Sequence, residues 1–319
     1  NIMRKKYFTK LTLAVLLLLP FSFVATSCLD DDSEFEEQVR IDDQKINEYL
    51  TDNNIVAQKH NSGIYYRKLT ENNTGTSLNR GNVVSFYYTI SLFDGTVLQS
   101  ISKENGDKPL QFCLLSNTMV PEGVDYGISL MKVGEKYQFF VPSYLAYGSY
   151  SCAYFQVNSN FIVDIEVTDV ETENDLFERQ IDSIQKYADL KYPGRYEKMP
   201  SGLFFIDSIP GTGFRPFVGS RVDIDFTRKY LNDSIITSAT GVSFFLDHFQ
   251  AVQGLEEGIK LMKEGGYAIL LMPAKLGFNE SLCIIPQKVR KELLYDRVIT
   301  SEVEPYSILK YVVRLRNTN

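Results

Sequence analysis

One stretch of this sequence, Gly127-Ile-Ser-Leu-Met-Lys-Val-Gly134, returns further along the chain as Gly258-Ile-Lys-Leu-Met-Lys-Glu-Gly265. Upstream of each copy, Ser62-Gly63-Ile-Tyr-Tyr66 returns as Ser201-Gly202-Leu-Phe-Phe205. After both copies the chain continues through an apolar run to a proline, with the same spacing in each. Self-similarity of this kind predicts two copies of one domain rather than two unrelated domains.

Each copy is predicted to consist mostly of β-strands. Apolar and polar residues alternate over residues 161–168 and 221–227, the pattern of a strand with one buried face. Asp94-Gly95 supplies the turn signal of a tight hairpin. One short helix in each copy places three apolar residues on a single face: Val124, Ile128 and Met131, then Leu255, Ile259 and Met262. Each copy is therefore an α+β domain, an antiparallel sheet with one helix against it.

The composition excludes several classes of protein. A chain of 319 residues with 44% hydrophobic side chains is long and apolar enough for about two folded domains. Two His and four Cys argue against a His/Cys zinc centre or a haem motif, and no glycine motif of a nucleotide site is present. The net charge of −7 argues against a nucleic-acid surface, which needs clustered Lys and Arg. We expect no cofactor, no metal and no nucleic-acid partner.

Residues 1–27 have the features of a bacterial export signal. Basic residues precede an apolar run from Leu11 to Leu19, and the small residues Ala25-Thr-Ser27 stand before Cys28. This placement resembles a bacterial lipoprotein signal, in which Cys28 becomes the lipidated first residue. The alternative is an ordinary cleaved signal with an incidental Cys. We expect a cell-envelope protein anchored by lipid to a bacterial membrane, on its periplasmic or surface side, with the acidic residues 30–37 as a solvated tether.

The remainder of the chain divides into a tether, two domains, a linker and one inserted loop. The predicted boundaries are 28–60 for the acidic tether and spacer helix, 61–171 for domain 1, 172–200 for a helical linker, and 201–319 for domain 2 with its long loop 279–304. The helical material at 41–58 and 175–190 is interpreted as solvated spacer. The loop mixes basic and apolar residues and could hold a short amphipathic helix. After Cys28, the remaining cysteines allow at most one internal disulfide, whose pairing stays open: Cys113, Cys152 and Cys283.

The first copy resembles the FKBP-type peptidyl-prolyl isomerase family in the order and spacing of its motifs. The matching segments are Arg80-Gly81-Asn82-Val83, Tyr87-Tyr88-Thr89, Asp94-Gly95-Thr96, the stretch from Gly127, Pro142, Ala146-Tyr147-Gly148 and the closing strand 161–167. The second copy matches less well, mainly at Gly254-Leu255-Glu256-Glu257-Gly258 and in its closing strand, 311–315. The resemblance implies that each copy folds as a curved antiparallel sheet wrapped around one short helix.

The resemblance also implies a binding site for proline in domain 1. Rotation about an Xaa-Pro bond is opposed by a barrier of about 18–20 kcal/mol. A protein lowers this barrier by binding the twisted amide better than either planar form, which an apolar aromatic pocket can do. The family's catalytic positions correspond to Tyr88 and Tyr147. Its substrate-binding positions correspond to Leu98, Gln99, Leu110, Val120, Val124, Tyr154, Phe155 and Val163, several of which replace aromatic or acidic residues of the family. By alignment, Pro121 stands where the family offers a backbone N–H, and proline has none. A shift of one residue would put Val120 or Glu122 at that position instead.

The corresponding pocket of domain 2 departs further from the family. Its predicted residues are Phe226, Ile236, Val252, Leu255, Phe278 and Tyr311. Phe226 and Phe278 stand in place of the two tyrosines, and core packing explains them better than an active site does. Val252 keeps the N–H that Pro121 lacks.

Two functions follow from this pattern as hypotheses. The first is an envelope isomerase acting on proline-containing segments of exported proteins, with any activity in domain 1. The second is a pair of degenerate domains that bind peptides or proteins as a chaperone or scaffold. Three or more pocket positions are altered in each copy, which favours weak or absent turnover.

Overall fold

The computed structural model describes residues 27–319, and the chain divides into two compact units between Ile55 and Val56. The predicted signal segment thus lies outside the described residues, apart from Ser27, and Cys28 is described only in its backbone. The first unit contains the helix α2 (Ser27–Asp52). The helix predicted over 41–58 is wrong beyond Asp52, because Asn54 adopts a left-handed backbone with φ of 54° and ends the segment in a turn. Within 27–319, no helix combines the length and the apolar character needed to cross a membrane.

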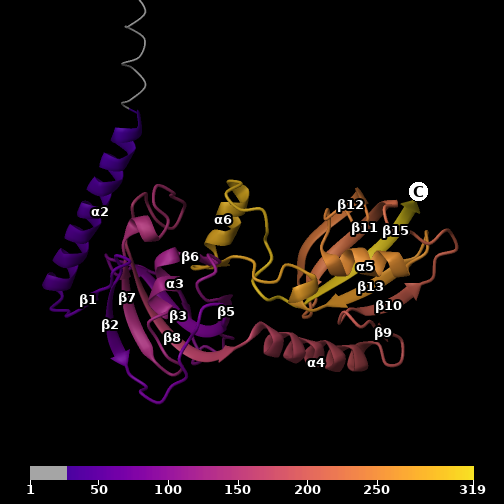
Figure 1. The fold of residues 1–319 in the computed structure, drawn as a ribbon, viewed down its shortest axis with the longest axis horizontal. Helices are drawn as coiled ribbons and strands as arrows, with labels where there is room; N and C mark the ends of the chain where they lie inside the picture. Colours follow the sequence, from indigo (N-terminus) through magenta and orange to yellow (C-terminus); the bar gives the residue numbers. More distant parts are fainter. Residues whose placement is uncertain (1–26) are drawn as a thin grey trace, which may run out of the picture. The chain divides into compact units, whose positions relative to one another are not determined.

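Domain 1 is built on one antiparallel sheet whose strand order is β1-β2-β7-β8-β3-β4, with β5 also paired to β3. The strands are β1 (Gln58–Lys59), β2 (Tyr65–Thr70), β3 (Val83–Leu92), β4 (Val97–Ile101), β5 (Leu110–Cys113), β7 (Lys136–Val141) and β8 (Phe161–Glu171). The sheet curves around the short helix α3 (Glu122–Ile128), as Figure 1 shows. The predicted α+β architecture is confirmed.

The helix α3 packs closely on the sheet because it contains a glycine at the contact. A Cβ at Gly127 would lie 2.8 Å from the ring of Phe139 on β7, closer than van der Waals contact allows. Val124 and Ile128 are fully buried in the same core, and Met131 joins them just beyond the helix. The short strand β6 (Met119–Val120) leads into α3, and the 3-10 turn η1 (Ser143–Leu145) follows β7.

Domain 2 repeats this topology. Its strand order is β12-β11-β15-β13-β10-β9. Read from the other end, β9 to β12, this order matches that of domain 1 from β1 to β4. The strands are β9 (Glu197–Lys198), β10 (Phe204–Ile209), β11 (Arg221–Tyr230), β12 (Ile235–Phe245), β13 (Tyr267–Met272) and β15 (Leu309–Thr318). The helix α5 (Gln253–Leu261) covers one face of this sheet, and the 3-10 turn η2 (Ala274–Leu276) follows β13 (Figure 1). Gly258 in α5 faces Leu270 as Gly127 faces Phe139.

The linker helix α4 (Glu173–Lys191) belongs to the core of domain 2. It begins with a capping box between Thr172 and Asp175. Its apolar residues pack on the face of the sheet opposite α5, against side chains of β10 and β13. The members of this cluster are Ile181, Ile184, Ala188, Phe204, Ile206 and Leu271. The prediction of a solvated spacer at 175–190 is therefore wrong, because that helix carries an apolar stripe that the sheet buries.

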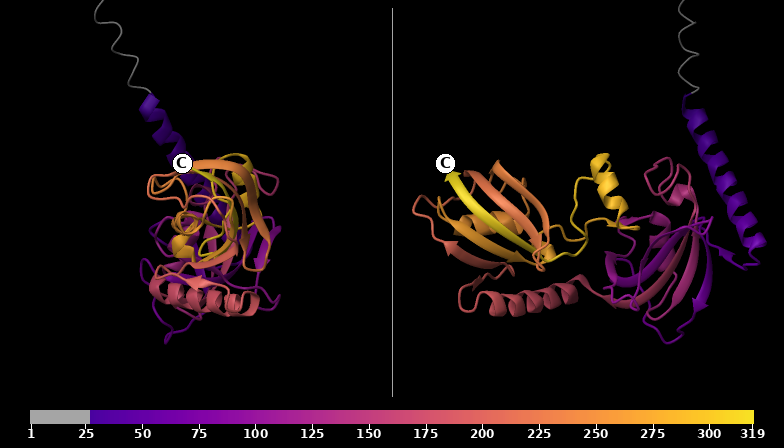
Figure 2. Two further views of the ribbon diagram at one scale, coloured as in Figure 1. Left: turned by 90° about the vertical axis from the view of Figure 1, so that its right-hand side faces the viewer. Right: turned by 180° about the vertical axis from the view of Figure 1, so that it is seen from behind.

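The chain makes one long excursion between η2 and β15. It contains the strand β14 (Cys283–Ile284) and the helix α6 (Val289–Tyr295), which confirms the amphipathic helix predicted in loop 279–304. β14 pairs in parallel with β6, so the excursion leaves domain 2 and joins domain 1. Figure 1 and the right-hand view of Figure 2 both show this path in gold.

Candidate functional site

The two predicted catalytic tyrosines lie in the core of domain 1. Tyr88 is on β3, and Tyr147 follows η1. All but one of the other predicted residues belong to the same core cluster or pack against it: Leu98, Leu110, Val120, Val124, Tyr154, Phe155 and Val163. The exception, Gln99 on β4, is linked to Tyr88, whose hydroxyl donates to Gln99 Oε1 at 2.9 Å. The structure thus brings the predicted positions of domain 1 together.

Aromatic rings surround Tyr147. The ring centroids of Tyr147 and Phe155 are 4.6 Å apart, and those of Tyr147 and Phe161 are 5.8 Å apart. Phe155 and Phe161 meet edge to face at 5.3 Å. The predicted site does not include Phe161, which is predicted only as part of the closing strand. The feature of the sequence that could have indicated this role is a large aromatic residue at the start of the closing strand, a few residues after the aromatic pair at 154–155.

The cleft of domain 1 is filled by a segment of the same chain. The hydroxyl of Tyr147 donates a hydrogen bond of 2.9 Å to the main-chain oxygen of Ile285, the residue before Pro286. The Ile285 N–H donates to the Val120 oxygen, also at 2.9 Å. Ile284, Ile285 and Pro286 are buried, and both isoleucines are part of the domain 1 core. The Ile285–Pro286 peptide bond is cis. An Xaa-Pro amide therefore occupies the position that was predicted for a substrate.

Gln99 holds the next residue of this segment. Its Oε1 accepts a hydrogen bond of 2.6 Å from the main-chain N–H of Gln287, in addition to the one from Tyr88. Its Nε2 donates to Gln287 Oε1 at 3.2 Å. At the preceding end, the Cys283 N–H donates to the Thr118 oxygen at 2.6 Å. The main chain of segment 283–287 is thus hydrogen-bonded at both ends and at its centre, to main-chain oxygens of Thr118 and Val120 and to the side chains of Gln99 and Tyr147.

The helix α6 closes the edge of the cleft. Val289 and Leu293 are buried in the domain 1 core. Lys288 lies over the ring of Tyr154, with 4.0 Å from its Nζ to the ring centroid. At the end of the helix, the Tyr150 hydroxyl donates to Asp296 Oδ2 at 2.8 Å. The α6 residues that make these contacts lie outside the predicted site. The sequence shows an Xaa-Pro pair in loop 279–304, Ile285-Pro286, but not that this pair lies in the cleft of domain 1.

The site has hydroxyl donors but lacks one backbone donor. Burial raises the pKa of both Tyr88 and Tyr147 well above the usual range, so each hydroxyl stays protonated and can donate. Pro121 precedes the first residue of α3 and has no N–H to offer. The Ile285 carbonyl accepts its hydrogen bond from the Tyr147 hydroxyl and not from a backbone N–H. The main chain beside Pro121 contributes an acceptor, the Val120 oxygen, which binds the Ile285 N–H. Burial also raises the pKa of the Cys283 thiol to about 12, which keeps it protonated.

Domain 2 has an open cavity at the corresponding place. Five of the six predicted residues line one cavity of about 430 Å³: Phe226, Val252, Leu255, Phe278 and Tyr311. Ile236 packs against the domain 2 core but does not line the cavity. Arg228, which was not among the predicted residues, lies on β11 two residues after Phe226 and also lines the cavity. The sequence could have indicated this position, because Arg228 continues the alternation of Ile224 and Phe226 and so falls on the buried face of the strand.

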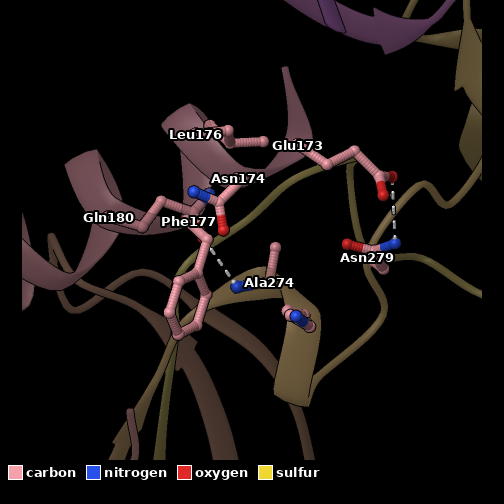
Figure 3. Close-up of a pocket in the computed structure, with 8 residues that line it drawn as sticks. Glu173, Asn174, Leu176, Phe177, Gln180, Ala274 and Asn279 are labelled. Carbon is pink, nitrogen blue, oxygen red and sulfur yellow. Dashed lines mark hydrogen bonds between the residues drawn. The ribbon is translucent and has the colours of Figure 1, made fainter. Parts of the chain in front are cut away.

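A smaller cavity of about 250 Å³ lies between the start of α4 and η2 (Figure 3). Gln180 is buried there and bridges two main-chain groups, accepting from Ala274 N–H at 2.8 Å and donating to the Tyr306 oxygen at 2.7 Å. Cys113, Glu173 and Glu280 bring their ligand atoms within 4.8 Å of one another, the single such group in the described part of the chain. Both carboxylates are exposed, and we assign no metal to them.

Comparison with known proteins agrees with this topology. The family model for FKBP-type peptidyl-prolyl cis-trans isomerases matches residues 75–168 and again residues 214–315. This chain belongs to the FKBP family. The two matched segments correspond to the two copies recognised from the internal repeat, so the chain carries FKBP domains in tandem.

The relatives are similar over one FKBP domain. FkpA from Aeromonas hydrophila, an FKBP-type isomerase, is 36% identical over 110 residues, which is 34% of this chain and 39% of FkpA. FK506-binding protein 2 from Yarrowia lipolytica is 34% identical over 110 residues, which is 34% of this chain and 74% of that protein. The crystal structure of FkpA from Escherichia coli matches with a TM-score of 0.36 at 25% identity, covering 44% of this chain and 64% of that one. The chain thus spans well under half of the Aeromonas FkpA it matches.

Proposed function

We propose that the first FKBP domain binds proline-containing peptide segments, and that in the resting protein it holds one from its own sequence, Ile285-Pro286. The observation that carries this proposal is the hydrogen bond from Tyr147 to the Ile285 carbonyl. That carbonyl belongs to the amide whose rotation an isomerase of this family would catalyse. A ligand from the same chain is present at a high effective concentration, so it competes strongly with any peptide in solution.

This arrangement favours the binding module over an efficient isomerase. The cleft lacks the N–H that Pro121 cannot supply, and its polar groups Tyr147 and Gln99 are already engaged by the segment 283–287. A free peptide gains access only when that segment leaves. We therefore propose low turnover in the intact chain, and binding of client segments by exchange with residues 283–287.

The proposal is tested by removing the internal ligand. Ser281 Oγ donates to the Val303 oxygen at 2.8 Å, so residues 282–302 can be replaced by a short glycine link without separating the flanking chain. The probe is acetyl-Ile-Ile-Pro-Gln-amide, which copies residues 284–287. Its binding is measured by titration calorimetry and its cis/trans exchange by NMR. The control is Tyr295→Ala, which alters an exposed residue of α6 and leaves the segment in place.

We expect the intact chain and Tyr295→Ala to bind the peptide weakly and the shortened chain to bind it well. Accelerated exchange with the shortened chain would identify a latent isomerase, and binding without acceleration would identify a binding module. Equal binding by the intact and shortened chains would overturn the proposed closure. A shortened chain that keeps its circular dichroism spectrum and sediments as a monomer but binds no peptide would overturn the proposed ligand class.

We further propose that the protein is an envelope lipoprotein held to a bacterial membrane by lipid on Cys28, with exported proteins as its clients. The support is the sequence of residues 1–28 and the acidic tether that follows. Labelled palmitate should enter the wild-type protein and not Cys28→Ser, and only the wild type should sediment with membranes. Labelling of both proteins, or of neither, would contradict the anchor.

A further inference from the structure

The cavity of domain 2 differs in chemistry from the filled cleft of domain 1. It is lined mostly by apolar side chains, and no acidic residue is among those that line it. Phe226 and Phe278 provide rings without hydroxyls, so the hydrogen-bond donors of Tyr88 and Tyr147 have no counterpart at these two positions. The cation in this cavity is Arg228.

The guanidinium of Arg228 is stacked among three aromatic rings. Its central carbon lies 4.5 Å from the ring centroid of Phe278, 5.4 Å from that of Tyr311 and 5.8 Å from that of Phe226. Its Nε donates to the Tyr311 hydroxyl at 2.7 Å. Stacking on aromatic faces orients a guanidinium while leaving its edge free for hydrogen bonds. The side chain is thus positioned before any ligand arrives.

Most of the donor capacity of Arg228 is unused. A guanidinium carries five N–H groups, and only the one on Nε has an acceptor among the described residues. Within the described chain, none of the ion pairs includes Arg228. A fixed cation in a mostly apolar cleft, without a counter-charge, favours an anionic ligand.

We propose that the cleft of domain 2 binds an apolar peptide segment that carries a carboxylate, with Arg228 as the partner of that carboxylate. A guanidinium edge matches the two oxygens of a carboxylate in a bidentate pair. The apolar walls formed by Leu255 and Phe278 receive the neighbouring side chain. The N–H of Val252, which finds no acceptor in the described part of the chain, lies at the cavity wall and can donate to a peptide carbonyl.

The rim of the cavity supports a peptide as the ligand. Phe249 lines the cavity, is 100% exposed and has a left-handed backbone with φ of 56°. An exposed ring at the edge of an apolar cleft adds contact area for a chain that continues beyond the cavity. The volume of about 430 Å³ lies within the range of pockets that enclose small ligands, about 300–1,000 Å³.

The test uses four peptides without proline, so its outcome is independent of the cleft of domain 1. They are acetyl-Ala-Leu-Phe with a free carboxylate, its amide, acetyl-Glu-Leu-Phe-amide and acetyl-Gln-Leu-Phe-amide. Each is titrated by calorimetry into residues 28–319 carrying Cys28→Ser. We expect at least one acidic peptide to bind roughly tenfold or more tightly than its neutral counterpart. The pair that shows the difference identifies the carboxylate as terminal or side-chain.

Variants at Arg228 decide whether this residue is responsible. Arg228→Gln should abolish the preference, so that the acidic peptide binds no more tightly than its neutral counterpart. Arg228→Lys should keep part of the preference, which guards against a misfolded glutamine variant. The matched control is Arg314→Gln, which removes the same charge from an exposed position on β15. Equal binding of acidic and neutral peptides, no binding at all, or equal effects of the two glutamine variants would overturn the proposal.

Discussion

The hydroxyl of Tyr147 lies 2.9 Å from the main-chain oxygen of Ile285, which is 138 residues further along the chain. This contact joins the cleft of the first FKBP domain to a loop inserted in the second. The Ile285 oxygen lies where the amide oxygen of an FKBP substrate is expected. Whether the cleft of domain 1 is occupied therefore depends on a loop that belongs to domain 2.

Removing this hydrogen bond should loosen the segment 283–287. In Tyr147→Phe the buried Ile285 carbonyl loses its donor, which costs about 1–3 kcal/mol. The Ile285 amide, which donates to Val120, should then exchange with solvent roughly tenfold faster, measured by hydrogen exchange with mass spectrometry. Tyr66→Phe serves as the control, because the hydroxyl of Tyr66 bonds to Gln58 in an exposed position. Similar exchange in both variants would contradict a role for Tyr147 in holding the segment.

Alanine at Gly127 should destabilise domain 1, although alanine is the better helix former. The new Cβ would meet the Phe139 ring at 2.8 Å, and overpacking of a core costs about 1–3 kcal/mol. The gain in helix propensity is at most about 1 kcal/mol. Denaturant unfolding, followed by circular dichroism, measures the difference.

The matched control for this change is a double variant. Phe139→Leu destabilises domain 1 by itself, but it makes room for the added methyl group. The two substitutions together should therefore cost less than the sum of the separate losses. Simple additivity would show that Gly127 and Phe139 are not in close contact.

The linker helix should behave as part of the domain 2 core. Ile184 is fully buried in α4, so Ile184→Ala should cost about 2–5 kcal/mol of unfolding free energy. Leu190→Ala in the same helix should change stability by less than about 0.5 kcal/mol, because Leu190 is 77% exposed. Chemical denaturation of both variants provides the measurement. Equal, small losses of stability in the two variants would indicate that α4 is a solvated spacer, as predicted from the sequence, and not part of the core.

The free energy of unfolding should depend on pH because of the buried carboxyl of Asp125. Burial raises the pKa of Asp125 to about 6, and its Oδ1 accepts a hydrogen bond of 2.8 Å from the Leu115 N–H. The carboxyl of an unfolded chain titrates near pH 4. Between about pH 4 and pH 6 the folded state therefore binds more protons than the unfolded state, and the free energy of unfolding falls as the pH rises.

Asp125→Asn isolates this effect, since asparagine keeps an oxygen for the Leu115 N–H and does not titrate. Relative to this variant, the wild type should lose on the order of 1–2 kcal/mol between pH 4 and pH 6, allowing for solvent screening. Urea unfolding at several pH values gives the comparison. A difference between the two proteins that stays constant with pH would mean that Asp125 titrates normally.

Much of the fold could be predicted because its determinants are local and repeated. The glycine stretches that end in Gly134 and Gly265 recur with their surrounding strands, and the two sheets share one strand order. The positions predicted around Tyr88 and Tyr147 also come together. They were predicted from the resemblance to the FKBP family, which fixes which positions of the fold face the cleft.

The occupant of the cleft could not be predicted in the same way. β14 and β6 contain two residues each, too few for any periodicity, and their pairing depends on how two distant segments meet. The burial of α4 was within reach of the sequence, because Ile181, Ile184 and Ala188 recur at helical spacing. Arg228 was missed because a charge on a strand usually marks its wet face, whereas here three rings surround it.

The parallel pairing of β14 with β6 has a consequence for how the protein can be dissected. A fragment that stops within the linker would contain a complete FKBP sheet, yet it would lose Ile284, Ile285, Val289 and Leu293 from its interior. Such a fragment would present bare aliphatic and aromatic surface to water and would tend to self-associate. Binding or activity measured on the isolated first half would therefore describe a domain whose core lacks the side chains of segment 283–293.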